Sequence, residues 1–237
     1  MSLKSYQKEF IEFALNNNVL YFGQFTLKSG RLSPYFFNAG KFDTGKSLSQ
    51  LGKYYAHAIV DQIKNSGLRF DGLFGPAYKG IPLVSATSIA LSLVGEQDSE
   101  IDVGPVPYTF NRKEKKDHGE GGSIVGADIK GKRVLIIDDV ITAGTAIRES
   151  FEIIKAAGGE VAGVVVAIDR QEKGKDTDKS AIQEIRSQYN IPVITVVDLA
   201  SIVKYLEEQK TEKETDNTEL IERMKEYRKT YGASESD

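Results

Sequence analysis

The sequence predicts an α/β protein with a mostly parallel central sheet flanked by helices. Between residues 70 and 208, short apolar runs alternate with longer runs in which apolar residues recur at helical spacing. Strands that alternate with helices in this way build parallel sheets, and helices cover both faces of such sheets. The chain has 237 residues, which is enough to bury a sizeable core in one domain of this class.

The composition narrows the classes of function. Hydrophobic residues make up 40% and charged residues 27%, which is typical of a soluble globular protein. A net charge of −3 gives no general attraction to nucleic acids or anionic membranes, so any affinity for phosphate must come from a local site. The absence of cysteine excludes disulfides and thiolate sites, and the two histidines, His57 and His118, argue against a histidine-rich zinc site. No signal-peptide or membrane-spanning pattern is present, and we expect a cytoplasmic protein.

The individual elements can be placed from their patterns. Residues 5–16 carry apolar side chains on one side of an amphipathic helix, and residues 21–40 are rich in aromatics and glycine, which favours short strands and turns. Further helices are expected at 48–64, 82–94, 145–157, 179–189 and 199–208, and strands at 70–75, 105–110, 132–138, 160–168 and 192–197. Gly158 is expected in the C-cap of its helix. The polar, glycine-containing residues 111–123 predict a mobile loop.

The last part of the chain differs from the rest. Residues 209–219 are polar and charged, which predicts a linker. Beyond the linker, helical spacing recurs in Leu220, Met224, Tyr227 and Tyr231. A terminal helix docked on the body or on a partner subunit explains this pattern, and a solvated, partly frayed tail explains it equally well.

The run VLIIDDVITAGTA at residues 134–146 is the most informative stretch. A buried strand that ends in Asp138 and Asp139 places both carboxylates at the edge of a parallel sheet where such folds bind ligands. Adjacent carboxylates repel each other and need hydroxyl donors or a cation. The small residues at 142–146 expose N–H groups at the start of a helix, where anions bind. Together these features predict a site for a ribose phosphate.

Other interpretations of the acidic pair are weaker once the whole run is considered. For the pair alone, a strand end whose aspartate caps the next helix is the more common arrangement. The run lacks the spaced glycines and the Lys-Ser or Lys-Thr of a Walker A loop, and no GxGxxG occurs. A phosphoacceptor signalling domain shares the acidic strand end but does not predict the remaining pattern.

The same run resembles the phosphoribosyl pyrophosphate signature of the type I phosphoribosyltransferases. Three further stretches, FTLKSGRLSPYFFNAG, GPAYKGIPL and FNRKEKKDHGEGG, resemble motifs of the orotate phosphoribosyltransferases in that family's order. The resemblance covers about residues 5–208. It implies the type I phosphoribosyltransferase fold in a single domain of residues 1–208, with a small N-terminal hood contributed mainly by about residues 1–40. Residues 209–237 would form a charged linker and a helical tail.

The resemblance implies where phosphoribosyl pyrophosphate binds. Asp138 and Asp139 would bind the ribose hydroxyls, the turn at 142–146 the 5-phosphate, and the other motifs the diphosphate. The implied set is Lys28, Tyr78, Lys79, Arg112, Lys113, Lys116, His118, Asp138, Asp139, Val140, Ile141, Thr142, Ala143, Gly144, Thr145 and Ala146. Without the resemblance, Lys28 would be read as a surface lysine, and Lys79 equally well as a solvated residue in a strand-to-helix turn.

The resemblance also implies a site for orotate. Phe36 and Phe37 stand where the family places the planar base, Thr142 borders it, and Arg170 would pair with the orotate carboxylate. Such a pair would discriminate against uracil, which lacks that group. Outside this context, core packing would be the preferred interpretation of the two phenylalanines, and Arg170 could be a surface arginine.

The implied activity is a Mg²⁺-dependent transfer of ribose 5-phosphate from phosphoribosyl pyrophosphate to N1 of orotate. Catalysis would involve Lys113, acting from the neighbouring subunit of a homodimer, with Lys116, His118, Asp138 and Asp139. Mg²⁺ would be held mainly by substrate and water, and no direct protein ligand is assigned. Two rivals stay open: a type I phosphoribosyltransferase for another base, and a ligand-sensing regulator of the same fold. Neither nucleic acid nor a membrane is expected as a partner.

Overall fold

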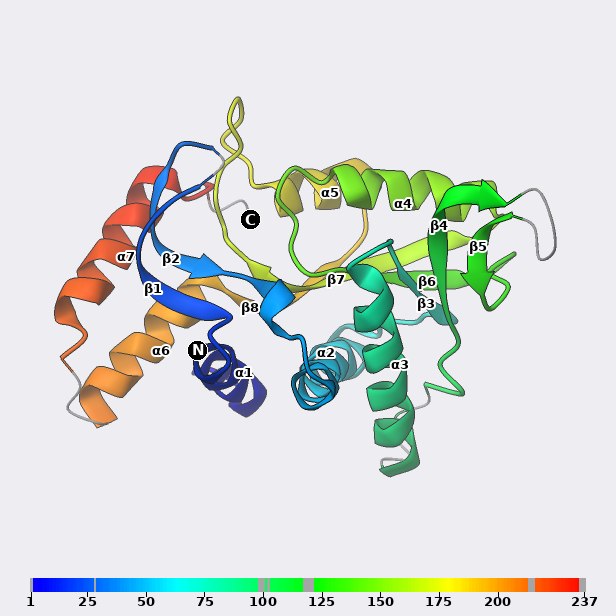
Figure 1. Ribbon diagram of the computed structural model, residues 1–237, viewed down its shortest axis with the longest axis horizontal. Helices are drawn as coiled ribbons and strands as arrows, with labels where there is room; N and C mark the ends of the chain where they lie inside the picture. Colours follow the sequence, from blue (N-terminus) through cyan, green and yellow to red (C-terminus); the bar gives the residue numbers. More distant parts are fainter. Residues whose placement is uncertain are drawn as a thin grey trace.

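A mostly parallel sheet forms the centre of the protein in a computed structural model that describes residues 2–27, 29–97, 101, 103–116, 122–212 and 216–234 (Figure 1). Its strands are β3 (Gly72–Gly75), β4 (Tyr108–Lys116), β5 (Gly122–Gly126), β6 (Arg133–Ile137), β7 (Glu160–Asp169) and β8 (Val193–Asp198). They lie in the order β5-β4-β3-β6-β7-β8. Neighbouring strands are parallel except β4 and β5, which pair antiparallel at one edge.

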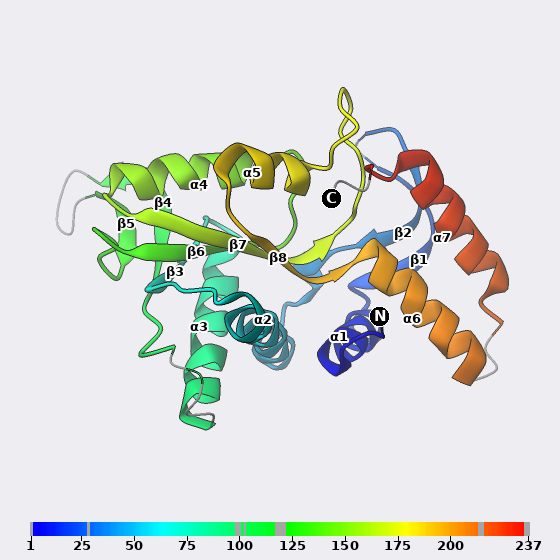
Figure 2. The same cartoon turned by 180° about the vertical axis from the view of Figure 1, so that it is seen from behind.

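Helices cover both faces of this sheet, as Figures 1 and 2 show from opposite sides. One face carries α1 (Ser5–Asn16), α2 (Gly45–Ser66) and α3 (Gly80–Gln97), and the other carries α4 (Thr145–Ala156) and α5 (Ala181–Tyr189). The alternation of side chains along β6 explains the two-sided core. Leu135 and Ile137 join the hydrophobic cluster under α1, α2 and α3, whereas Val134 and Ile136 join the cluster under α4 and α5.

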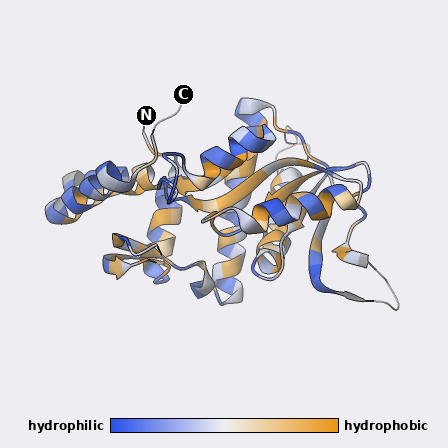
Figure 3. Cartoon of the chain, turned by 90° about the horizontal axis from the view of Figure 1, so that it is seen from above, coloured by the Kyte–Doolittle hydropathy of each residue, from blue (hydrophilic) through white to orange (hydrophobic). Residues whose placement is uncertain are grey.

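The hydropathy of the chain follows these layers. In Figure 3 the central strands are mainly hydrophobic, while the helices alternate between hydrophobic and hydrophilic residues. Each fully buried Val, Leu or Ile stabilises the fold by roughly 1.5–3 kcal/mol relative to an exposed one. No helix among the residues described is long and apolar enough to cross a membrane.

A separate hairpin and the last helices lie at one end of the sheet. The hairpin consists of β1 (Leu20–Thr26) and β2 (Leu32–Phe37), followed by the 3₁₀ helix η1 (Ala39–Lys41). The last helices are α6 (Leu199–Glu212) and α7 (Thr218–Tyr231). The arrangement places the N-terminal hairpin beside the C-terminal helix, as both ribbon views show.

The C-terminal helix α7 is docked on the body of its own chain. Its residues Ile221, Met224 and Tyr227 are buried, and the helix packs against β2 and α6. The Tyr227 ring meets the ring of Tyr35 edge to face, with centroids 6.2 Å apart. Of the arrangements left open by the sequence, the docked helix is therefore the one that the structure shows. The expected linker also begins later, because α6 continues to Glu212.

The expected helices and strands are confirmed in order, but besides the start of the linker one further expectation was wrong. Residues 111–123 do not form only a loop, because β4 continues to Lys116 and β5 begins at Gly122. These strands form the antiparallel edge of the sheet. An edge hairpin has solvent access that a central parallel strand lacks, so it tolerates the charged residues that suggested a loop.

Candidate active site

The carboxyl ends of β3 and β6 define the candidate site. The strand after β3 in the chain, β4, lies on one side of β3, whereas β7 lies on the opposite side of β6. Chain connections therefore diverge between these two neighbouring strands, and ligands of open α/β sheets bind at such a point. The loops that follow β3 and β6 contain the GPAYKG and DDVITAGTA motifs. The Nζ atom of Lys79 lies 2.8 Å from Oδ2 of Asp139, which joins the two loops directly.

The acidic pair is buried at this edge. Asp138 and Asp139 are each only 7% exposed. The backbone N–H of Asp139 donates to Oδ1 of Asp138 at 2.9 Å, and that of Val140 donates to Oδ1 of Asp139 at 2.8 Å. The hydroxyl of Tyr55 in α2 donates to the backbone carbonyl of Asp138 at 2.7 Å, which fixes the end of the strand against that helix. Neither carboxylate caps the following helix, so the alternative that the pair alone suggested is wrong.

The charge of this pair is only partly balanced. Burial, followed by the charge of Asp139, raises the pKa of Asp138 to about 7. Lys79 supplies a cation to Asp139, and this contact raises the pKa of Lys79. Two carboxylates facing one lysine can still accept hydrogen bonds from ligand hydroxyls, as a ribose would offer.

The turn after the acidic pair opens the amino end of α4. Its N-cap is Gly144, which has φ +73° and makes no side-chain cap hydrogen bond. Around Gly144, the residues Thr142, Ala143, Thr145 and Ala146 are exposed. N–H groups and the helix dipole at an uncapped helix start favour an anion such as phosphate.

Two side chains that lie outside the turns support them. The Nη1 atom of Arg148 donates to the carbonyl of Ala143 at 2.6 Å, which holds the α4 turn from behind. The Oδ1 atom of Asn111 accepts from the backbone N–H of Ala77 at 2.8 Å, which fixes the turn after β3. The sequence contained no signal for either contact, because each partner lies in a different element.

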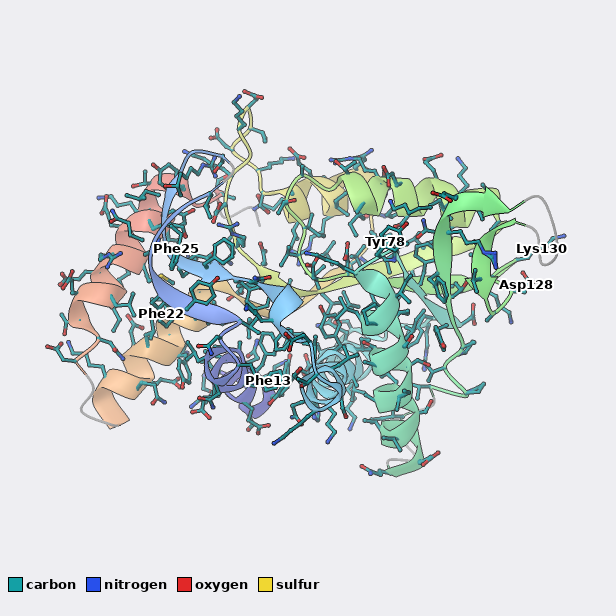
Figure 4. The ribbon with its side chains drawn as sticks, in the orientation of Figure 1. Phe13, Phe22, Phe25, Tyr78, Asp128 and Lys130 are labelled. Atoms are coloured by element: carbon teal, nitrogen blue, oxygen red, sulfur yellow. The ribbon has the colours of Figure 1, made fainter. Side chains whose placement is uncertain are left out.

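The turn after β3 presents Tyr78 and Lys79. The peptide bond between Ala77 and Tyr78 is cis, and the Tyr78 side chain is 73% exposed beyond the first turn of α3 (Figure 4). Gly75 and Gly80 pack so closely that a Cβ on Gly75 would lie 2.4 Å from the carbonyl oxygen of Gly80. Close backbone approach is therefore the reason for these glycines.

The cationic motif is only partly described. The Nη1 atom of Arg112 is buried without a hydrogen-bond partner among the residues described. Lys113 lies 3.7 Å from Glu149 of α4, and both side chains are largely exposed. Lys28 and His118 lie outside the described residues, and for Lys116 only the backbone position at the end of β4 is described.

The two phenylalanines expected to bind the base lie at the end of β2 in the N-terminal hairpin. The Phe36 ring packs near Tyr21 and Phe25 within the hairpin, with centroids 5.6 and 5.7 Å away, and the Phe37 ring lies 6.4 Å from that of Phe10. These contacts show that the two phenylalanines also serve the packing of the hood.

Arg170 is held against the same hairpin. Its Nη2 atom lies 2.7 Å from Oε1 of Glu172, and its Nε atom donates to the hydroxyl of Tyr35 at 3.4 Å. Tyr35 precedes Phe36 in β2, so Arg170 contacts the strand that carries the expected aromatic pair, although the side chains of Tyr35 and Phe36 leave opposite faces of that strand. Sequence reasoning missed Tyr35 and Glu172, although both are neighbours of residues that it singled out.

The largest cavity that we describe lies elsewhere. It has a volume of about 460 Å³ and opens at the amino-terminal edge of the sheet, where Arg69, Asp71, Asp128 and Arg133 line it. Its mixed charges favour no particular ligand, and of the motif residues only Val134, at the start of β6, lines it. The carboxyl edge, where the motifs meet, remains the candidate active site.

Comparison with known proteins identifies the family. The phosphoribosyl transferase domain family matches residues 47–200. The chain is 54% identical to the orotate phosphoribosyltransferase of Aliivibrio fischeri and 56% identical to that of Vibrio parahaemolyticus, over 97% of this chain and 100% of each relative. The crystal structure of orotate phosphoribosyltransferase from Francisella tularensis has a TM-score of 0.78 at 50% identity, covering 94% of this chain and 99% of that one. The chain belongs to the orotate phosphoribosyltransferase family.

Membership of the orotate phosphoribosyltransferase family confirms the expected fold, an α/β type I phosphoribosyltransferase domain with a mostly parallel sheet. The metal expected for the family is not placed by the protein alone. The structure contains no cluster of three or more His, Cys, Asp or Glu side chains within its described ranges that could hold a metal ion.

Proposed function

We propose that this chain catalyses the transfer of ribose 5-phosphate from phosphoribosyl pyrophosphate to N1 of orotate. The products are orotidine 5′-monophosphate and diphosphate, which places the reaction in pyrimidine biosynthesis. The observation that carries this proposal is the identity of 54–56% to orotate phosphoribosyltransferases over 97% of the chain. The geometry of the carboxyl edge supports it, because a buried acidic pair and an uncapped helix start lie in one loop.

Phosphoribosyl pyrophosphate would bind between the loops after β3 and β6. Asp138 and Asp139 accept hydrogen bonds from the ribose hydroxyls, and residues 140–146 bind the 5-phosphate through N–H groups and hydroxyls. Tyr78, Lys79 and Arg112 face the diphosphate. The orphaned Nη1 of Arg112 supports that role, since a buried guanidinium nitrogen without a partner favours an anionic ligand. The family resemblance adds Lys28, Lys116 and His118.

Orotate would bind between the hood and Arg170. Phe36 and Phe37 border the planar ring, Thr142 borders it from the α4 turn, and the Arg170 guanidinium pairs with the carboxylate. Arg170 is supported through Nε and Nη2, so its Nη1–Nη2 edge can still make a bidentate contact.

Substitution takes place at the anomeric carbon. N1 of orotate forms the new bond to that carbon and releases its proton to solvent or to the departing diphosphate. The bond to the diphosphate oxygen breaks with inversion, and the diphosphate takes the electron pair. Cations in a water-poor site stabilise the leaving diphosphate, and Lys113, Lys116 and His118 supply them.

Mg²⁺ is the proposed cofactor. When bound to substrate oxygens and water, it would neutralise charge on the diphosphate. The incompletely balanced acidic pair fits a nearby cation, and Asp138 and Asp139 are the carboxylates that this edge offers to such an ion.

The proposed assembly is a homodimer in which Lys113 acts in the neighbouring subunit's site. Helix α3 exposes Ile89 and Leu93, which are 65% and 47% exposed and which a second subunit could cover. The contact of Lys113 with Glu149 of its own chain is between exposed side chains and therefore weak, so it does not hold the lysine back. We also propose that residues 1–208 form the catalytic domain, that residues 209–237 are an appended segment, and that the protein works in the cytoplasm.

An acceptor assay tests the function. Purified protein with phosphoribosyl pyrophosphate and Mg²⁺ is offered orotate, uracil, adenine or hypoxanthine, and diphosphate release is measured for each. We expect release with orotate and little with the other bases. Turnover of a purine base or uracil without turnover of orotate would refute the assignment, and no turnover of any base would favour a ligand-sensing regulator.

A further inference from the structure

The C-terminal segment packs back onto the loop that carries Arg170. The backbone N–H of Lys173 donates to the carbonyl of Tyr231 at 2.9 Å, and that of Ala233 donates to the carbonyl of Gln171 at 2.8 Å. Glu172 and Gly232 pair as an antiparallel bridge between these contacts. Residues 231–233 therefore act as a short strand that holds the loop immediately after Arg170.

Glu172 is the charged centre of this junction. Its Oε1 atom lies 2.7 Å from Nη2 of Arg170, and its Oε2 atom lies 3.7 Å from Nη1 of Arg31. All of these side chains are largely buried, so their orientation is better defined than that of an exposed ion pair. The carboxylate thus lies between the arginine expected to bind orotate and an arginine of the hood.

Tyr227 extends this junction into α7. Its hydroxyl is buried without a hydrogen-bond partner among the residues described, and burial followed by the charge of nearby Glu172 raises the pKa of Tyr227. The hydroxyl therefore keeps its proton at neutral pH and is a potential donor close to the Glu172 carboxylate. The Tyr227 ring also packs edge to face on Tyr35, whose hydroxyl accepts from Nε of Arg170.

Arg31 closes the junction from the hood. Its Nη1 and Nη2 atoms donate to the carbonyls of Lys173 and Gly174 at 2.8 and 3.0 Å. The guanidinium of Arg31 also lies over the ring of Tyr231, 5.2 Å from its centroid. Hood, Arg170 loop and C-terminal helix are thus joined by polar contacts through one buried cluster.

This cluster leaves one edge of Arg170 available. Glu172 and Tyr35 engage Nη2 and Nε, and Nη1 has no partner among the residues that the structure describes. A guanidinium held on one side presents its remaining edge in a defined direction, and bidentate binding of a carboxylate needs such a direction.

We propose that Glu172, in the loop that carries Arg170, and Tyr227, in the C-terminal helix α7, are positioning residues that orient Arg170 toward the carboxylate of the acceptor base. The role rests on the proposed function, because it assumes that Arg170 binds that carboxylate. It assigns a purpose to α7: this helix sets the affinity for the acceptor, while phosphoribosyl pyrophosphate is held by separate loops.

Steady-state kinetics of the full-length variants Glu172→Gln and Tyr227→Phe tests the proposal. We expect Glu172→Gln to raise the KM for orotate about tenfold or more, because a charged contact with Arg170 is weakened. We expect Tyr227→Phe to raise it about fivefold, because a buried polar group close to Glu172 is removed. The KM for phosphoribosyl pyrophosphate should stay within about twofold in both variants, since one hydrogen bond elsewhere does not affect its loops. Tyr205→Phe is the matched control, because the Tyr205 hydroxyl donates to Glu12 at 3.2 Å in a buried region away from the site. This control should leave both KM values unchanged.

The outcomes separate this proposal from the proposed function. Equal increases in both KM values, or no change in the KM for orotate in Tyr227→Phe, would overturn the positioning role while orotate turnover by the unmodified protein stands. If Glu172→Gln fails to fold, Tyr227→Phe still decides, because it removes a single oxygen atom. Absence of orotate turnover by the unmodified protein would instead overturn the proposed function itself.

Discussion

Asp138 and Asp139 are like charges that the fold keeps out of water at the end of β6. Their position could be predicted from the sequence, because a strand of apolar residues runs directly into them. The partial balance of their charge could not be predicted, because Lys79, the one cation paired with them within the described ranges, comes from a loop 60 residues earlier. Desolvation and mutual repulsion raise the pKa of Asp138 to about 7, so the ligand-free site is electrostatically costly at neutral pH.

Asp138→Asn should make the ligand-free protein more stable at pH 8. The folded pKa of Asp138 lies above the unfolded value near 3.8, so between these values the folded chain binds more protons. The contribution of this group to the free energy of unfolding is therefore fully present below about pH 4 and is lost as the pH rises through about 7. Asparagine at this position cannot ionise, so the variant does not lose this free energy as the pH rises. Thermal unfolding at pH 8 should show a gain on the order of 1 kcal/mol, since one pKa unit corresponds to about 1.4 kcal/mol. The gain should shrink toward pH 5.

The exposed Asp128, which Figure 4 shows beside Lys130, provides the control, because it precedes the amino end of β6 whereas the acidic pair follows the carboxyl end. Asp128→Asn should change stability by less than about 0.5 kcal/mol at either pH, as exposed substitutions usually do. The Asp138→Asn variant should also lose most orotate turnover, because it weakens binding of the ribose hydroxyls. A stability gain equal at pH 5 and pH 8 would contradict the role of ionisation.

At the level of elements, the amino end of α4 is the part most closely adapted to an anion. Gly144 allows the left-handed turn, Arg148 holds the turn from behind, and no side chain caps the helix. The small residues of this turn allowed the anion-binding helix start to be predicted from the sequence. The contact with Arg148 did not appear there, since an arginine in the first turn of a helix has many possible partners.

Gly144→Ala should raise the KM for phosphoribosyl pyrophosphate. A Cβ at this position would lie 2.7 Å from Nη1 of Arg148, and φ is +73°. An L residue at positive φ costs roughly 1–2 kcal/mol, and displacement of Arg148 would reshape the turn. We expect an increase in KM of about tenfold, which corresponds to about 1.4 kcal/mol of lost binding.

Gly158→Ala is the matched control for the same helix. Gly158 has φ +77° just beyond the other end of α4. A Cβ on Gly158 would have Cγ of Lys130 as its nearest neighbour, 3.3 Å away. The control should lower the melting temperature by a similar amount without changing the KM for phosphoribosyl pyrophosphate. Similar KM increases in both variants would mean that helix stability, rather than the shape of the turn, controls binding.

The β4–β5 hairpin shows why sequence patterns identify edge strands poorly. A central strand such as β6 is recognised by its continuous apolar run, because both of its faces are buried. The residues of β4 beyond Phe110 are mostly charged, since an edge hairpin has water nearby. The charged residues that made this strand look like a loop in the sequence include the cations proposed to bind the diphosphate.

For the whole molecule, the proposed dimer predicts that two inactive variants can restore activity when their subunits are combined. Lys113→Ala subunits lack the cation that acts across the interface, and subunits with Asp138→Asn and Asp139→Asn lack a ribose site. Mixing the two should form one complete site in each mixed dimer. Random exchange in a twofold dimer makes half of the dimers mixed, so about a quarter of the unmodified activity should return.

Each variant alone should remain nearly inactive, and diphosphate release before and after mixing is the measurement. Native mass spectrometry establishes that mixed dimers have formed. Mixed dimers without recovered activity would show that Lys113 does not act across the interface.

The long-range organisation could be predicted only in part. Motifs that follow successive strands could be assigned to one sheet edge because parallel topology requires it. The support of Arg170 could not be assigned, because Tyr35 and Tyr227 lie 135 and 57 residues away and nothing local marks them as partners. Contacts between distant segments depend on how the hood and the last helix close on each other, and that closure leaves only ordinary core-packing signals in the sequence.

The pairing of residues 231–233 with the Arg170 loop also bears on how the protein is made. A chain emerges from the ribosome from its amino end, and all residues that hold phosphoribosyl pyrophosphate have been synthesised by residue 146. The supports of Arg170 are incomplete until the final residues have been added. A nascent or prematurely terminated chain can therefore possess the loops for the sugar phosphate without a properly oriented arginine for the base. Changes at residues 231–233 should therefore affect the acceptor half of the enzyme and spare the loops for the sugar phosphate.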